Sequence, residues 1–277
     1  MLSKRIISGS LMAISIGLVI FFIPSLFLGY FLALMLSISC WEFFNLRFSS
    51  SVSLVLSLII LSFFVFLPYQ ILLFQIILFL GVFFWLILVM QIIIFPLNKA
   101  FLQNKFLWLS TGLITHFTFW VSFHLILNDQ NSILLSFGLD ITSRGSLLLL
   151  VCLSVLMDSL AYYGGRKMGR RRFLSNISPN KTFEGFLFAI ILSPLILLIL
   201  LSFIGEIETL SLYFVLLVSA LFSVLGDAFA SLFKRISGAK DFSNLIPGHG
   251  GVLDRIDSHM ACFPAFLFII YLINAFF

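Results

Sequence analysis

Apolar runs of about 20 residues, long enough to span a bilayer, recur from one end of this chain to the other. A run of this length crosses the hydrocarbon core of a bilayer as an α-helix, which satisfies the hydrogen bonds of its own backbone. Hydrophobic residues make up 61% of the chain and charged residues only 10%. A soluble domain cannot bury so much apolar surface. The sequence therefore predicts an all-α, polytopic integral membrane protein.

Nine transmembrane helices account for the apolar runs when the breaks are placed at prolines, glycines and polar stretches. Their expected ranges are 6–22, 26–44, 52–67, 71–95, 106–127, 146–163, 186–204, 210–236 and 256–276. We expect three parts, an N-terminal part (1–105), a middle part with a basic cytoplasmic loop (106–185) and a C-terminal catalytic part (186–277).

The charged residues separate by side when the chain crosses the membrane nine times. Among the basic residues, only Arg144 falls on the side away from the N-terminus, and the loops on that side carry Asp129, Asp140, Glu206 and Glu208. The positive-inside rule then places the basic loop 164–185 and the loop 237–255 in the cytoplasm. We therefore expect a polar active-site cavity at the cytoplasmic side, and a C-terminus on the outer side.

The segment 223–257 holds many charged residues for so apolar a chain. Its first part places four polar residues on one face of a helix, namely Asp227, Ser231, Lys234 and Arg235. A carboxylate beside a bilayer is costly unless it binds something, so this stripe indicates a site for a metal–phosphate unit. The structural alternative is an ion pair between Asp227 and Lys234, with basic side chains that reach the interface.

A glycine-containing loop follows, with Lys240 and Asp241 first and then His249, Gly250 and Gly251. Glycine lets a backbone approach a ligand closely and turn its amides toward an anion, although such a run also forms a simple turn.

Asp254 and Asp257 come next, three residues apart on one face of the last helix, with Arg255 between them. Carboxylates are favourable at a helix N-terminus, so capping by one of them would explain part of this pattern. Capping alone does not explain two acids and a base at this spacing, and we expect these residues to belong to the site.

Polar residues of the middle part extend the candidate site. Asp158 lies in an apolar run close to its cytoplasmic end, and Lys181 and Glu184 enter the following helix. Capping by Thr182 is an alternative explanation for the second group. The consecutive arginines at 170–172 are typical of a surface that attracts lipid headgroups, or of a topology signal.

Taken together, these residues resemble the phosphatidate cytidylyltransferases, or CDP-diacylglycerol synthases. That family's pattern is a serine, Lys-Arg three residues on, Lys-Asp, His-Gly-Gly and Asp-Arg-x-Asp. In this chain it stands at Ser231, Lys234-Arg235, Lys240-Asp241, His249-Gly250-Gly251, Asp254-Arg255 and Asp257. The likeness extends to individual motif residues in the C-terminal half. Two positions depart from the family pattern, with Ser159 where threonine is more usual and Ser243 where glycine is more usual. The N-terminal half matches only in hydropathy, Lys4-Arg5 and the helix end at Trp41-Glu42, which by itself is typical of an aromatic belt.

The resemblance implies transfer of the CMP moiety of CTP to phosphatidate, giving CDP-diacylglycerol and pyrophosphate in phospholipid biosynthesis. It implies Mg²⁺ as cofactor, with K⁺ as a second cation, held by Asp227, Asp254 and Asp257. The catalytic residues that it implies are Asp227, Lys234, Arg235, Asp254, Arg255 and Asp257. The substrate-binding residues are Asp158, Lys181, Glu184, Ser231, Lys240, Asp241, His249, Gly250 and Gly251. It further implies a homodimer in a bacterial inner (cytoplasmic) membrane.

Other classes share some of these features. Another CTP-dependent lipid enzyme, such as an ether-lipid cytidylyltransferase or a polyprenol kinase, would use similar cation–phosphate chemistry without the complete pattern. A transporter would distribute its ionisable residues along a path through the membrane midplane. Here they gather at one face, which favours an enzyme, and the modest net charge of +5 gives no indication of a nucleic-acid partner.

Overall fold

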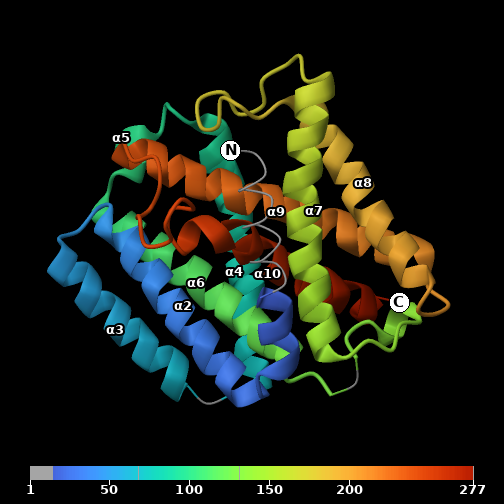
Figure 1. Cartoon of the computed structure of the whole chain (residues 1–277). Helices are drawn as coiled ribbons and strands as arrows, with labels where there is room; N and C mark the ends of the chain where they lie inside the picture. Colours follow the sequence, from blue (N-terminus) through green and yellow to red (C-terminus); the bar gives the residue numbers. More distant parts are fainter. Residues whose placement is uncertain (1–14, 68, 131, 277) are drawn as a thin grey trace.

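The computed structural model describes residues 15–67, 69–130 and 132–276 (Figure 1). Regular structure within these ranges is helical, apart from two isolated β-bridges. The helices are α2 (Ser25–Asn45), α3 (Ser50–Phe66), α4 (Ile71–Ile94), α5 (Lys99–Leu102), α6 (Lys105–Leu127), η1 (Leu135–Phe137), α7 (Ser143–Met168), α8 (Phe183–Ser202), α9 (Thr209–Ser237) and α10 (Leu253–Phe276). Residues 15–22 are also helical, and the rest of the predicted first helix lies outside the described residues.

Seven of the described helices are long and apolar enough to cross a membrane, namely α2, α4, α6, α7, α8, α9 and α10. Helix α3 is also apolar but has only 17 residues, a length of about 25 Å at 1.5 Å per residue. The prediction of an all-α, multi-pass integral membrane protein is confirmed.

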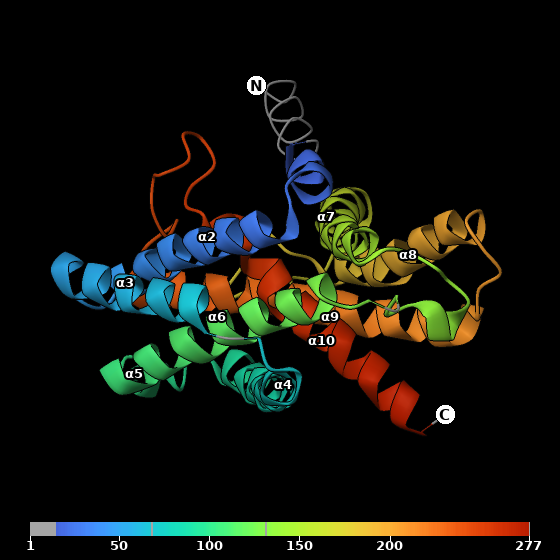
Figure 2. The same cartoon turned by 90° about the horizontal axis from the view of Figure 1, so that it is seen from below.

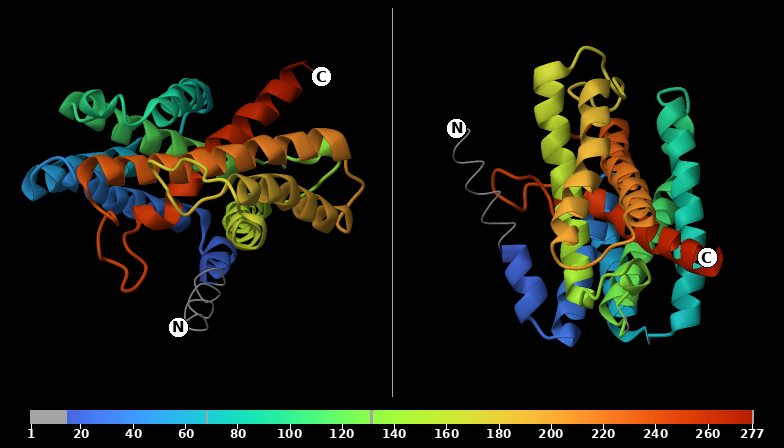
Figure 3. Two further views of the ribbon diagram at one scale, coloured as in Figure 1. Left: turned by 90° about the horizontal axis from the view of Figure 1, so that it is seen from above. Right: turned by 90° about the vertical axis from the view of Figure 1, so that its right-hand side faces the viewer.

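Neighbouring helices pair along the chain, α2 with α3, α7 with α8, and α9 with α10. Helix α10 also packs against α2, α4, α6 and α7, and Figures 1 and 3 show it crossing the bundle obliquely. Because α10 contacts helices that range along the chain from α2 to α9, residues at its N-terminus can meet side chains from distant segments.

The end of α7 differs from the prediction. A loop is predicted from Gly164, yet α7 continues to Met168. The reason is tertiary packing, because glycines bring α7 and α8 into close contact. A Cβ at Gly185 would lie 2.5 Å from the carbonyl oxygen of Ala161, and a Cβ at Gly165 would lie 2.8 Å from the Thr182 hydroxyl. These glycines therefore form a helix–helix contact and do not begin the loop.

One end of the bundle collects the loops 169–182 and 238–252. Arg235 near the end of α9 donates from Nε to the carbonyl oxygen of Ile177, 3.0 Å away. Arg144 lies at the start of α7, hence at the opposite end, where it donates to the carbonyl oxygens of Ile20 and Phe21. This arrangement agrees with the separation of charges in the sequence. We refer to the end with the two loops as the polar end.

Candidate active site

Two ion pairs connect separate segments at the polar end. Lys234 on α9 pairs with Asp254 on α10, with 2.6 Å between Nζ and Oδ1, and these side chains are only 14% and 5% exposed. Lys181 in the loop 169–182 pairs with Asp227 on α9, where the side chains are 31% and 22% exposed. The alternative, an ion pair between Asp227 and Lys234 within α9, does not form. Asp227 pairs instead with the loop 169–182, and Lys234 pairs with α10.

The Asp254 carboxylate joins the glycine-containing loop to α9. While Oδ1 accepts from Lys234, Oδ2 accepts from the backbone N–H groups of Phe242 (3.0 Å) and Gly251 (2.9 Å). A Cβ at Gly250 would lie 2.8 Å from Oδ2, and the φ of +80° at Gly250 also favours glycine. In this conformation the glycines make room for a carboxylate of the chain itself.

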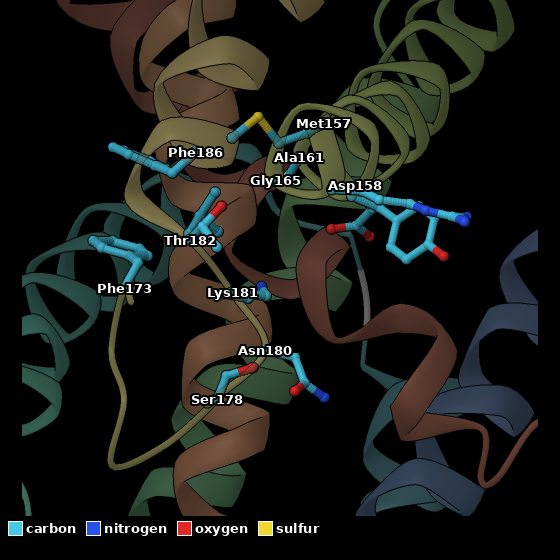
Figure 4. A pocket seen from close by; sticks show the side chains of 13 residues that line it. Met157, Asp158, Ala161, Gly165, Phe173, Ser178, Asn180, Lys181, Thr182 and Phe186 are labelled. Atoms are coloured by element: carbon cyan, nitrogen blue, oxygen red, sulfur yellow. The ribbon is translucent and has the colours of Figure 1, made fainter. Parts of the chain in front are cut away.

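A cavity of about 480 Å³ lies between α7, α8, α9 and the loop 169–182 (Figure 4). Asp158 enters its wall from α7, and Lys181 enters from the loop (Figure 4). Burial lowers the pKa of Lys181 below its ordinary value, and the carboxylates of Asp158 and Asp257 act in the opposite direction. Apolar residues, among them Phe173 and Phe186, line other parts of the wall. The cavity therefore suits an amphipathic ligand with an anionic group.

The loop 169–182 is fastened largely by residues close to it in the chain. The Glu184 carboxylate accepts from the backbone N–H groups of Arg170 (2.9 Å) and Arg171 (3.1 Å). The Thr182 side chain accepts from Gly185 N–H at 3.2 Å, so Thr182 caps α8, as the alternative explanation for this segment expected. The consecutive arginines at 170–172 are exposed. Glu184 thus holds the backbone of the loop in this conformation.

The other predicted site residues lie at the same end in different environments. Arg235, Lys240, Asp241 and Arg255 are exposed, Ser231 and His249 are half-buried, and Asp257 is buried. The structure thus brings Lys181, Asp227, Lys234 and Asp254 into direct pairs, while Arg235, Lys240 and Arg255 stay exposed at the same end.

Sequence reasoning missed Glu42, at the C-terminal end of α2. Its side chain is fully buried, and its carboxylate accepts from the Ser243 hydroxyl (2.5 Å) and from the N–H groups of Val252 (2.9 Å) and Leu253 (2.7 Å). The rule that an acid in an apolar run of a membrane helix marks a functional site could have identified it. Its neighbour Trp41 instead makes this helix end look like part of an aromatic belt at the membrane interface.

The carboxylates proposed as metal ligands have the right chemistry for a hard cation, which prefers oxygen. Asp227 and Asp257 lie where α9 and α10 approach each other closely, since a Cβ at Gly226 would be 2.2 Å from the carbonyl oxygen of Asp257. Within the described part of the chain, no three acidic, histidine or cysteine side chains converge to form a metal site by themselves. This donor set fits a cation that takes its remaining ligands from a substrate, as Mg²⁺ commonly does.

The fold and this site define a multi-pass membrane protein with paired lysines and carboxylates at one end of a helical bundle, a chemistry suited to phosphate esters. The chain belongs to the cytidylyltransferase family, whose model matches residues 3–273.

Curated relatives match a shorter stretch. The phosphatidate cytidylyltransferase of Haemophilus influenzae is 40% identical over 121 residues, which is 42% of each chain. Proteins of the same name from Staphylococcus haemolyticus and Staphylococcus epidermidis are 43% and 44% identical over 112 and 110 residues, or 39% of this chain and 42% of theirs. The matched stretch thus spans less than half the length of these relatives.

Proposed function

We propose that this chain transfers the cytidylyl group of CTP to phosphatidate, giving CDP-diacylglycerol and pyrophosphate in phospholipid biosynthesis. The observation that carries the proposal is the pair of lysine–carboxylate contacts, Lys234–Asp254 and Lys181–Asp227, beside a cavity with charged and apolar walls. Family membership and the names of the relatives agree with it.

In this reaction a phosphatidate oxygen forms a bond to the α-phosphorus of CTP. The bond from that phosphorus to the oxygen that bridges to the β-phosphorus breaks, and pyrophosphate leaves with the electron pair. Both reactants are polyanions, so the main task of the site is to hold them together and to stabilise charge. Lys181 and Lys234 can do this by exchanging their carboxylate partners for phosphate oxygens. The exposed Arg235 and Arg255, which directly follow Lys234 and Asp254 in the chain, would extend the cationic surface. The nucleophile is already ionised at neutral pH, so no strong base is required.

We propose Mg²⁺ as the cofactor, with K⁺ as a second cation, and Asp227, Asp254 and Asp257 as the carboxylates that would hold them. Bound Mg²⁺ would neutralise charge on the triphosphate. Removal of divalent cations with EDTA should therefore abolish turnover, and added Mg²⁺ should restore it. Isothermal titration of the protein with Mg²⁺, with and without a nonhydrolysable CTP analogue, would show whether tight binding requires the nucleotide.

We further propose that the polar end faces the cytoplasm, in a bacterial inner membrane, and that the protein is a homodimer. The placement rests on the positive-inside rule, since the exposed arginines at 170–172 lie at this end. Single cysteines at Asn176 and Asn244, in a background without the three native cysteines, should react only with a membrane-permeant thiol reagent in intact cells. Labelling by an impermeant reagent at either position would overturn the placement. Light scattering of the detergent-solubilised protein would test the dimer.

The decisive experiment for the reaction uses the purified chain with labelled CTP, phosphatidate and Mg²⁺, followed by lipid extraction. We expect the lipid fraction to become labelled when CTP carries the label on its α-phosphorus, and to stay unlabelled when CTP carries it on the γ-phosphorus. Lipid label from γ-labelled CTP would indicate a kinase, and absence of both products would overturn the proposal. Replacing phosphatidate with an ether-linked phosphate lipid tests the nearest alternative substrate. A transporter is disfavoured, because the paired charges gather at one end of the bundle.

A further inference from the structure

We propose that Glu42 is a positioning residue that holds the loop 238–252, and through it Asp254, in the arrangement needed for nucleotide binding. Its effect on catalysis rests on the proposed function, whereas its hold on the loop does not. The inference gives α2, which lies outside the charged motifs of the C-terminal half, a defined task. Figure 2 shows the loop projecting from the bundle beside α2.

The first observation is the set of hydrogen bonds that Glu42 accepts. Its buried carboxylate meets the hydroxyl of Ser243 in the loop and the N–H groups of Val252 and Leu253, where the loop enters α10. N–H groups at the start of a helix have no partner within that helix and favour a negative charge. One carboxylate therefore fastens both the early part of the loop and its last residues.

The second observation is apolar and independent of the first. Phe43, the next residue of α2, is fully buried and has its ring centroid 6.2 Å from that of Phe242 in the loop and 5.0 Å from that of Phe233 on α9. Trp108 on α6 donates from its indole nitrogen to the Phe43 carbonyl oxygen at 3.1 Å, which anchors this part of α2. Two consecutive residues of α2 thus hold the loop, one through polar contacts and one through aromatic packing.

The third observation concerns Gly251. A Cβ at this position would lie 2.5 Å from Oε1 of Glu42. Gly251 is not among the described residues with positive φ, so space and not backbone conformation excludes a side chain here. Gly250 differs, because its φ is +80° and a Cβ there would approach Asp254. Of these two glycines, only Gly251 is needed to make room for Glu42.

These contacts link Glu42 to the ion pair of the site. Gly251 donates its N–H to Oδ2 of Asp254, and Oδ1 of the same carboxylate accepts from Lys234. A change at Glu42 that moves Gly251 would therefore disturb the position of Asp254 and of the lysine that we assign to phosphate binding.

A double-mutant cycle tests the inference in the full chain. We expect Gly251→Ala to lower kcat/KM for CTP at least about tenfold in the wild-type background, and by less than about twofold when Glu42 is already alanine. Gly250→Ala is the comparison variant, because the strain from its φ of +80° does not involve Glu42, so its cost should change much less between the two backgrounds than that of Gly251→Ala. Equal costs for Gly251→Ala in the two backgrounds would overturn the proposal.

Hydrogen exchange of the detergent-solubilised protein gives a readout that does not depend on activity. Glu42→Gln should speed exchange of the backbone amides at 240–252 while helices α4 and α8 stay protected, and Glu42→Asp, which keeps the charge, should restore part of the protection. Unchanged exchange in the loop, or faster exchange throughout the protein, would overturn a specific positioning role. If the wild-type chain makes no CDP-lipid, the proposed reaction fails and the exchange result still decides the role of Glu42.

Discussion

The two loops of the polar end are held by the same kinds of contact, but the contacts come from different places in the chain. The loop 238–252 is held by Glu42 and Phe43, and Glu42 is 201 positions away in sequence from its partner Ser243. The loop 169–182 is held by Glu184 and Phe186, which both lie on α8, the helix that follows the loop. The ring of Phe186 stacks on that of Phe173 in the loop, with 4.8 Å between the ring centroids.

This difference separates a loop whose carboxylate and aromatic contacts come from a distant helix from one that combines such contacts from the next helix with links to α9 through Lys181 and Ile177. Glu42 is fully buried, so its hydrogen bonds form where water does not compete. The bonds of Glu184 are formed at the surface and can be replaced by water. The ion pairs differ in burial in the same direction, since the side chains of Lys234 and Asp254 are less exposed than those of Lys181 and Asp227. We therefore expect substitutions around the loop 238–252 to have the larger effects.

The largest effect is expected for Asp254→Asn. The change leaves Lys234 without its charged partner and cannot satisfy both that lysine and two N–H donors. Breaking a buried pair on one side costs about 3–5 kcal/mol, which corresponds to a loss of about two to four orders of magnitude in kcat/KM if it acts on the bound transition state. Initial rates with varied CTP measure this loss. Asp140→Asn, an exposed acid at the opposite end, is the control and should leave the rate unchanged.

The second prediction compares the two lysines directly. Lys234→Ala should lower kcat/KM by about two orders of magnitude, and Lys181→Ala by about one, because the first side chain is 14% exposed and the second 31%. Steady-state kinetics in mixed micelles, with CTP and phosphatidate varied separately, would measure both. Lys105→Ala, an exposed lysine at the same end, controls for general attraction of anions. Equal losses for all three variants would mean that the cationic surface, and not these pairs, matters.

The sequence predicts the helical membrane fold because apolar runs of bilayer length leave few alternatives. It also identifies the residues of the ion pairs, since helical spacing shows that Asp227 and Lys234 share a face. Their partners could not be assigned, because spacing along one helix does not say which segment faces it. Lys181 and Asp254 become partners only when the loop 169–182 and α10 pack against α9.

Glu42 illustrates the same limit over a longer distance. The end of an apolar run is an ordinary place for an acid, and nothing local connects Glu42 with a loop 200 residues later. The helical extension to Met168 was missed for a related reason, because Gly164 and Gly165 are weak helix formers that are stabilised here by packing against α8. Tertiary contacts, which one sequence does not reveal, decide both cases.

The third prediction moves to the locally held loop. Glu184→Gln keeps one oxygen to accept a bond from the N–H of Arg170 or Arg171 but removes the charge. Because these bonds are at the surface, we expect kcat/KM to fall only about threefold to tenfold, in line with one charge-assisted hydrogen bond of modest strength. Hydrogen exchange should quicken at 170–175 and stay unchanged at 240–252. A loss as large as that of Asp254→Asn would show that Glu184 contacts substrate and does more than hold the loop.

The smallest effect is expected for Arg171→Ala. Its backbone N–H bonds Glu184 and is kept in the variant, while its exposed side chain adds one charge to a basic surface. Exposed charges contribute about 0–1 kcal/mol and are screened by salt, so kcat/KM should fall by less than about fivefold, and the difference should vanish as ionic strength rises toward 0.5 M. The measurement is kcat/KM at a series of salt concentrations on vesicles with and without anionic lipid, beside Lys234→Ala. A loss that persists at high salt and equals that of Lys234→Ala would place Arg171 in contact with a phosphate and remove the contrast between the two loops.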